Sequence, residues 1–357
     1  MTVPAGPPPP KIVLAVGAPD GMTGAKAEQR FADATLPGIS GITGALMQWL
    51  HAHEHPFAVV MFGSARRLTE ETTERWLQAT QGEVLVNLIC EPETQRLALR
   101  QLASFELAAQ LPLVNPSWAV TATARPVIAR RLAHQIGVRA PHCTLFRAGT
   151  LTLAEHIEAR GHTYPVLLRP PGRHGSEGLV RVDDASEITS QARALRLSCT
   201  VTDFVDFRSA DGLWRKYRIV YAGDRLFRRH VLTDREWNLT REARAFMKDR
   251  PELIAQERAW INRPVTLERD SIEARVMHQF RALQLDFGVM DFALPPDGDL
   301  VIFEINACVQ LTNPTDAEAT ADDRYFEANN GVILAALVAE ISARAGLSAQ
   351  LRGPDGG

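Results

Sequence analysis

The chain has 357 residues, of which 45% are hydrophobic and 23% charged, and its formal net charge is -3. Because one ordinary core does not grow to this length, we expect two or three compact units with room for a cleft between them. The composition is typical of a soluble globular protein and argues against a general nucleic-acid binder. No stretch approaches the roughly 18 apolar residues of a membrane span, and the first residues lack the basic-then-apolar order of a signal peptide. The sequence therefore predicts a cytoplasmic protein with neither a membrane nor a nucleic acid as partner.

The first part of the chain alternates strands and helices in the way that is typical of a parallel sheet. Residues 1–10 are rich in proline, which lacks the amide donor and fixes φ, so we expect a disordered tail there. The buried runs KIVLAVG, FAVVMFG and EVLVNLIC then alternate with helical stretches. Residues 11–118 are therefore predicted to form a small parallel α/β domain.

The rest of the chain is richer in strands and in hairpin signals, which indicates antiparallel sheets. Within residues 119–200, a helix in RPVIARRLAHQIG precedes the strands YPVLLRPP and GLVRVDD, which flank a glycine-bearing loop. Within residues 201–347, RKYRIVY and RLFRRHVL form a hairpin whose turn is built on Gly223 and Asp224. A charged helical stretch then leads to a second hairpin, LDFGVMDFAL with LVIFEINACVQL. We expect a smaller unit in 119–200, a larger one in 201–347 and a flexible tail in 348–357.

Three oxygen-bearing side chains converge in the second hairpin. Glu304 and Asn306 lie two residues apart on one apolar strand, so both side chains emerge on the same face. If Leu294 pairs with Val301, Asp291 lies opposite Glu304 on that face. Two carboxylates and an amide oxygen, completed by phosphate and water, suit octahedral Mg²⁺. The alternative is that these residues only pair with nearby arginines.

The loop in YPVLLRPPGRHGSEGLVRV is a second candidate site. A strand delivers Arg169 to the edge of a loop that contains Gly172, His174, Gly175 and Ser176. Such a loop can fold over phosphates with its backbone amides, while the arginine neutralises their charge. The alternative is a plain hairpin loop.

The first hairpin is strongly basic. Lys216 and Arg218 lie on one face of its first strand, and the returning strand carries Arg225, Arg228, Arg229 and His230. A solvated basic face is the usual explanation of such a run. A sheet that also holds a metal site requires cations aimed at phosphate and at a substrate carboxylate, so we interpret Lys216 and Arg218 as catalytic.

Taken in order, these segments resemble the ATP-grasp superfamily of carboxylate-amine ligases over roughly residues 11–345. YPVLLRPPGRHGSEGL is similar to the family's strand and phosphate-covering loop, and GVMDFAL with VIFEINACVQL is similar to its paired metal-binding strands. ARPVIARRLAHQIGVRAP is similar to the helix that opens the family's lid domain. The resemblance implies an N-terminal parallel α/β domain, a small lid domain and a larger antiparallel domain that carries the metal ligands.

The resemblance also implies roles for particular residues around Mg²⁺ and the transferred phosphate. Asp291, Glu304 and Asn306 would hold Mg²⁺, for which Mn²⁺ could substitute. Arg218 would stabilise the transferred phosphoryl group or an acyl phosphate. Where the family usually carries lysines for the α- and β-phosphates, this chain has Arg125 and Arg169, which keep the charge but change its geometry.

The nucleoside end of ATP is assigned by the same likeness. The backbone around Thr202, Asp203, Phe204 and Val205 would meet the adenine. Asp206 or Asp211 would reach the ribose.

The implied reaction joins a small or peptide-like carboxylate to an amine. ATP phosphorylates the carboxylate, ADP leaves, and the amine then displaces phosphate. No enzyme nucleophile is required, and no nucleophile elbow or triad order is present in the sequence. The alternatives are an ATP-dependent carboxylate kinase or activator, and a nucleotide-binding protein that does not ligate. Dimerisation through the N-terminal domain is a further expectation from the likeness.

Overall fold

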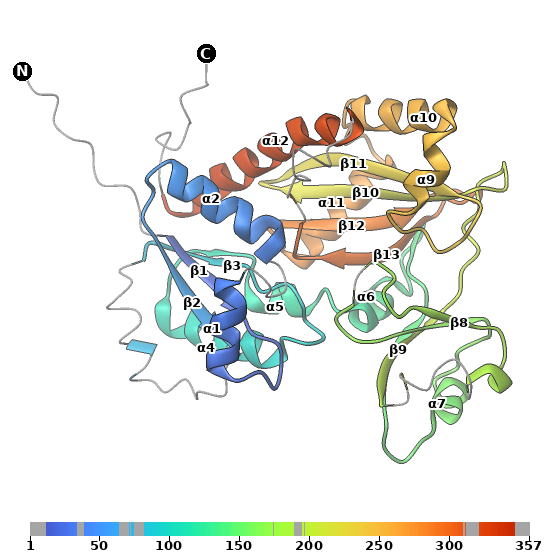
Figure 1. Ribbon diagram of the computed structural model, residues 1–357, viewed down its shortest axis with the longest axis horizontal. Helices are drawn as coiled ribbons and strands as arrows, with labels where there is room; N and C mark the ends of the chain where they lie inside the picture. The colour runs from blue at the N-terminus through green and yellow to red at the C-terminus, as the bar shows by residue number, and fades with distance from the viewer. Residues whose placement is uncertain are drawn as a thin grey trace, which may run out of the picture.

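A computed structural model describes residues 12–33, 39–63, 71, 73–74, 82–173, 175–188, 195, 197–309, 311 and 321–346, with only the backbone at 39–40 and 321–329. The predicted tails at 1–10 and 348–357 lie outside the described residues, as does His174 of the glycine-bearing loop. The chain forms three sheets with helices packed around them, a mixed α/β architecture that confirms the predicted fold class (Figure 1).

Sheet A is the parallel sheet predicted for the N-terminal part of the chain. Its strand order is β2-β1-β3-β4, and every pair is parallel. The strands are β1 (Ile12–Gly17), β2 (Phe57–Phe62), β3 (Val84–Asn87) and β4 (Leu113–Val114). Its helices are α1 (Gly24–Ala32), α2 (Gly44–Ala52), α4 (Arg96–Ala109) and α5 (Ser117–Thr121), with a π-helical turn at Ile39–Thr43. Because β1 and β3 are completely buried, they read as continuous apolar runs rather than alternating ones.

Sheet B carries both predicted hairpins, in the order β11-β10-β12-β13-β5. Its strands are β10 (Trp214–Ala222), β11 (Arg225–Asp234), β12 (Phe287–Ala293), β13 (Leu300–Asn306) and β5 (Val138–Arg139). The pairs are antiparallel except for β13 with β5. The first hairpin turns at Gly223 and Asp224, as predicted, and both residues have positive φ. The helices near sheet B are α6 (Arg125–Leu132), α9 (Ala243–Lys248), α10 (Pro251–Asn262), α11 (Ile272–Leu283) and α12 (Ala321–Arg344).

Sheet C is smaller and antiparallel, in the order β6-β9-β7-β8. It consists of β6 (Cys143–Arg147), β7 (Val166–Arg169), β8 (Val180–Val182) and β9 (Ser198–Asp203), with helix α7 (Leu153–Ala159) and a 3-10 turn at Ala185–Glu187. Sheet C thus ends at Asp203, a few residues past the predicted limit at 200. Strand β5, which precedes it, pairs with β13 of sheet B, and helix α6 contacts both β13 of sheet B and β6 of sheet C.

The buried cores explain how the sheets are held. One large core joins residues of sheet A and its helices, such as Phe105, to residues of sheet B, such as Phe292. Sheet C has a separate core around Phe146, Val166 and Val201. Sheets A and B therefore share buried apolar surface, whereas sheet C buries its own. Among the described helices, none is long and apolar enough to cross a membrane.

Candidate active site

A pocket opens between sheet C and one face of sheet B. Helix α6 and strand β7 bring Arg125 and Arg169 to it, and the loop after β7 contributes Gly175 and Ser176. The end of β9 and the segment that follows contribute Thr202, Asp203, Phe204 and Val205. Sheet B contributes Lys216 and Arg218 from β10, Asp291 from β12 and Glu304 from β13. The fold thus gathers most of the predicted site residues from three separate parts of the chain.

Asp291 lies directly opposite Glu304 across β12 and β13, as the hairpin pattern predicts. The predicted pairing of Leu294 with Val301 is wrong, because Ala293 pairs with Val301 and the register shifts next to Asp291. This bulge leaves Phe303 as the extra residue of β13, and both Phe303 and Glu304 line the pocket. A bulge re-aims side chains in this way.

Asp291 is 2% exposed and is held by two cations of β10. Nε and Nη2 of Arg218 donate to its two carboxylate oxygens at 2.5 and 2.7 Å, and Nζ of Lys216 lies 3.7 Å from Oδ2. Burial alone lowers the pKa of the Arg218 guanidinium, but the charge and hydrogen bonds of Asp291, together with the charge of Glu304, more than offset it, so this pKa is raised. Arg218 is therefore a permanent cation inside the pocket.

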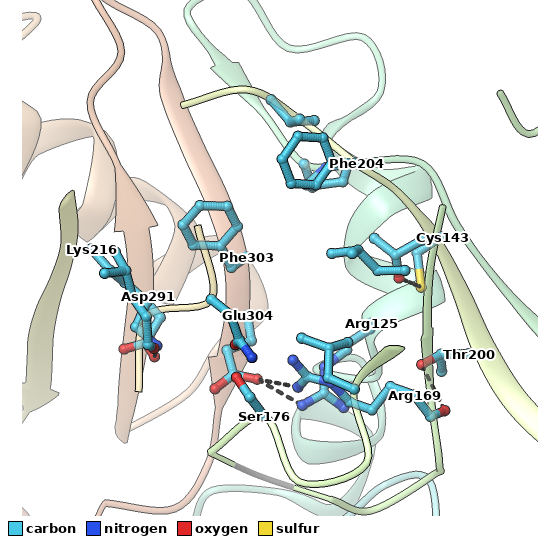
Figure 2. Close-up of a pocket in the computed structure, with 18 of the residues that line it drawn as sticks. Arg125, Cys143, Arg169, Ser176, Thr200, Phe204, Lys216, Asp291, Phe303 and Glu304 are labelled. Carbon is cyan, nitrogen blue, oxygen red and sulfur yellow. Dashed lines mark hydrogen bonds and ion pairs between the residues drawn. The ribbon is translucent and has the colours of Figure 1, made fainter. Parts of the chain in front are cut away.

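Glu304 contacts both Arg125 and Arg169. Nη2 of Arg125 donates to its Oε2 at 2.6 Å, and Nη1 of Arg169 lies 3.7 Å from the same oxygen (Figure 2). Burial lowers the pKa of Arg169, and the nearby charge of Arg125 lowers it further. One carboxylate oxygen thus holds two guanidinium groups that repel each other, which favours an additional anion between them.

Of the three predicted metal ligands, Asp291 and Glu304 line the pocket and Asn306 does not. Within the described part of the chain, no three or more His, Cys, Asp or Glu side chains form a metal-binding group. Asn306 pairs with Val289, is partly exposed, and is not among the residues that line the pocket. The carboxylates of Asp291 and Glu304 pair with arginines, as in the alternative interpretation. The pairing of β12 with β13 also places the two residues directly opposite each other.

The glycine-bearing loop is anchored on the N-terminal part of the chain. The N–H of Gly172 donates to Oε2 of Glu93 at 3.2 Å, and Nη1 of Arg125 donates to Oε1 of the same carboxylate at 3.2 Å. Gly172 does not line the pocket; it lies against Thr94. Glu93 and Thr94 were not predicted, although they follow the buried strand β3 at its carboxyl end, where polar residues of parallel sheets gather at sites.

Replacing Gly172 by alanine is expected to release this loop from its anchor. Gly172 has φ +67°, and a Cβ there would lie 2.5 Å from Cγ2 of Thr94. An L-residue in this conformation costs about 1–3 kcal/mol, to which the clash adds. We expect faster proteolysis within the loop and weaker ATP binding. Gly161→Ala is the matched control, because Gly161 has φ +68° but open space around its Cβ position; equal effects of the two changes would exclude the contact with Thr94 as the cause.

One end of the pocket, next to the segment that follows β9, is apolar. Phe204 makes an edge contact with Trp237 at 5.6 Å, and Phe207 makes one with Phe303 at 4.8 Å. Trp237, Phe207 and Phe303 line the pocket but were not predicted as site residues. The available signal was Trp237, a large aromatic residue within a stretch rich in charged residues.

The two carboxylates proposed for the ribose are not brought into the pocket. Asp206 pairs with Arg208, and Asp211 pairs with Arg215, both at exposed positions. The Arg215 contact lowers the pKa of Asp211 to about 2. Neither carboxylate is among the lining residues.

The pocket thus lies between sheet C, which has its own core, and sheet B, which carries ion pairs. No family model matches the chain, and no curated protein matches its sequence. Solved structures match over nearly the whole length. D-alanine–D-alanine ligase from Bacillus anthracis aligns with a TM-score of 0.53 at 11% identity, over 94% of this chain and 97% of the ligase.

Two nucleotide complexes are also similar. The same ligase complexed with ATP aligns with a TM-score of 0.51 at 12% identity, over 94% of this chain and 96% of that one. Carboxyaminoimidazole ribonucleotide synthase from Aspergillus clavatus, complexed with ATP, aligns with a TM-score of 0.50 at 13% identity, over 96% of this chain and 78% of that one. The chain therefore has the fold of these enzymes, which confirms the ATP-grasp fold that the resemblance implied.

Proposed function

We propose that this chain is an ATP-dependent ligase that joins a carboxylate to an amine and releases ADP and phosphate. The observation that carries the proposal is the cationic pocket between sheets B and C, where Arg125, Arg169, Lys216 and Arg218 surround two carboxylates. The similar solved structures include a D-alanine–D-alanine ligase complexed with ATP, which supports the same class of reaction here.

The pocket fits ATP at both of its ends. Phe204, Phe207 and Trp237 offer apolar surface for the adenine, and the backbone after β9 offers hydrogen-bonding groups at its edge. Arg125 and Arg169 would bind the phosphates, in competition with Glu304. The backbone of the loop around Gly175 and Ser176 would cover them.

The donor set fits Mg²⁺, with Mn²⁺ as a substitute. Mg²⁺ is commonly bound by one or two carboxylates together with phosphate and water, which Asp291 and Glu304 satisfy from opposite strands. The amide oxygen of Asn306, two residues from Glu304, is the proposed third protein donor. Such an ion supplies neutralisation of the phosphate charge.

The residues of the chain would then stabilise the charge of the reacting groups and would form no covalent bond to the substrate. Arg218 and Lys216 would orient the substrate carboxylate and stabilise the phosphoryl group that passes to it, which gives an acyl phosphate and ADP. The amine would attack the acyl carbon, lose a proton and displace phosphate. Burial raises the pKa of the Cys143 thiol to about 11, so this pocket residue stays protonated and is no nucleophile.

The test is to incubate the chain with Mg-ATP and panels of carboxylic acids, with and without amines. ADP formation that requires both an acid and an amine would support the ligase. ADP and hydroxylamine-trapped hydroxamate without any need for an amine would point to a carboxylate kinase. AMP formation would contradict the acyl-phosphate route, and tight Mg-ATP binding without turnover would indicate a binding protein.

A further inference from the structure

A network of hydrogen-bonded side chains, the His162 network, lies between sheet C and α7. Nδ1 of His162 donates to Oδ1 of Asp203 at 2.6 Å. Oγ1 of Thr144 lies 2.7 Å from Nε2 of His162 and 2.9 Å from Nε2 of His156. The network therefore joins α7 and the loop after it to β6 and to the last residue of β9.

The chemistry of these groups defines the direction of each hydrogen bond. A carboxylate only accepts, so Nδ1 of His162 carries a proton, and in the neutral ring Nε2 accepts from the hydroxyl of Thr144. The same hydroxyl oxygen then accepts from Nε2 of His156. Burial lowers the pKa of His156, and the nearby Arg160 lowers it further, which favours the neutral ring. The orientation of His162 is thus defined at both of its nitrogens.

The centre of the His162 network is shielded from water. The side chain of His162 is 0% exposed, whereas that of Asp203 is 20% exposed. Val166, which pairs with Asp203, and Val201, which pairs with Thr144, belong to the core of sheet C. Directly paired residues project to the same face of a sheet, so Asp203 and Thr144 face this core. Hydrogen bonds in such surroundings are stronger than in water and define one geometry.

The segment that begins at Asp203 forms part of the pocket, because residues 203–205 line it. Two backbone hydrogen bonds hold this segment. The N–H of Asp203 donates to the carbonyl of His142 at 2.9 Å, and the N–H of Phe204 donates to the carbonyl of Pro165 at 2.9 Å. The imidazole of the His162 network adds a contact to the side chain of Asp203. The first residue of the segment is therefore held at both its backbone and its carboxylate.

We propose that His162 is a positioning residue of the nucleotide site: its ring, oriented by Thr144, fixes Asp203 and thereby the segment that receives the adenine. The assignment rests on the proposed function, in which this segment meets the adenine of ATP. His162 itself is not among the lining residues, so it acts on the nucleotide through Asp203. A preorganised binding segment raises affinity because less conformational freedom is lost when the ligand binds.

Calorimetric titration of the full chain with Mg-ATP, and with Mg-tripolyphosphate as a probe that lacks the nucleoside, tests this role. His162→Gln places an amide near Nε2 but loses the donor at Nδ1. We expect it to bind Mg-ATP about tenfold more weakly than the wild type, and tripolyphosphate equally well. His162→Asn keeps a donor near Nδ1 and should retain most of the affinity for ATP. Equal weakening for both probes, or equal affinities of the two variants for ATP, would overturn the positioning role.

Replacements of Thr144 give a second test that differs by one hydroxyl. Thr144→Val has nearly the shape of threonine but cannot orient His162, so KM for ATP should rise while kcat stays unchanged. Thr144→Ser keeps the hydroxyl and should behave as the wild type. Thr163→Val is the matched control, since Thr163 follows His162 in the chain and is exposed. An unchanged KM in Thr144→Val, or the same rise in Thr163→Val, would contradict the proposal.

A measurement on the unmodified chain keeps the test independent of variant folding. The Nδ1–H resonance of His162, identified by its loss in His162→Gln, should shift with Mg-ATP and stay in place with Mg-tripolyphosphate. The same response to both probes would count against the positioning role. A nucleoside-dependent shift without ADP formation from any acid and amine would contradict the ligase alone. Turnover with unchanged ATP affinity in His162→Gln would contradict only the positioning role.

Discussion

Glu304→Gln is expected to lower kcat by about 10³-fold while leaving the fold intact, because the amide has nearly the same shape but cannot supply the anionic oxygen. The change also removes the charge that holds Arg125 at 2.6 Å and Arg169 at 3.7 Å. Arg169 then becomes available to the phosphates, and Arg125 retains only its pair with Glu93. We therefore expect KM for ATP to stay the same or fall as kcat collapses, in steady-state measurements of ADP release.

This split between kcat and KM distinguishes a catalytic carboxylate from a structural one. A residue that only positions the two arginines would raise KM when it is changed. Asp297→Asn is the control, since Asp297 lies in the loop of the same hairpin, pairs with Arg139 and is exposed. It should behave as the wild type. Near-normal turnover of Glu304→Gln would remove this residue from the site.

The elements that repeat a local pattern were predictable from sequence. The buried runs of sheet A, the turn at Gly223 and Asp224, and the opposition of Asp291 to Glu304 all follow from side-chain alternation or turn chemistry. The bulge at Phe303 was not predictable, because VIFEIN is an unbroken strand pattern. Helix α1 has no counterpart among the predicted elements, since it begins at Gly24 directly after a small-residue loop.

Contacts between segments that are distant in the chain could not be predicted from the sequence either. Glu93 meets Gly172 across 79 positions of the chain, and no local period reports such a pair. The basic run on β11 was interpreted as one group, whereas Arg228 pairs with Glu273 of α11 and the bulge follows directly after it in the strand. A run of basic residues shows where cations lie along a strand. The face of the sheet to which each side chain points depends on the register of the strand with its neighbours.

Sheet B carries an ion pair on each face, Arg228 with Glu273 and Arg218 with Asp291, and the two should respond differently to the same replacement. Arg228 and Glu273 have side chains that are 1% and 0% exposed, and they lie away from the pocket. Glu273→Gln is expected to lower the free energy of unfolding by about 3–5 kcal/mol, because it leaves a buried guanidinium without its counter-charge. Denaturant unfolding followed by circular dichroism measures this loss.

Replacing both members of each ion pair by apolar residues tests whether the pair is needed for folding or for turnover. Arg228→Met with Glu273→Leu should recover most of the lost stability and retain ADP-forming turnover, because hydrophobic residues of similar volume can replace a buried pair. Arg218→Met with Asp291→Leu should also fold, since it too removes both charges together, yet its turnover should be abolished. If the first double variant lost turnover, or the second retained it, the division of sheet B into a structural face and a reactive face would be wrong. Under the proposed function the charges at Arg218 act on a substrate, whereas the pair at Arg228 joins β11 to α11.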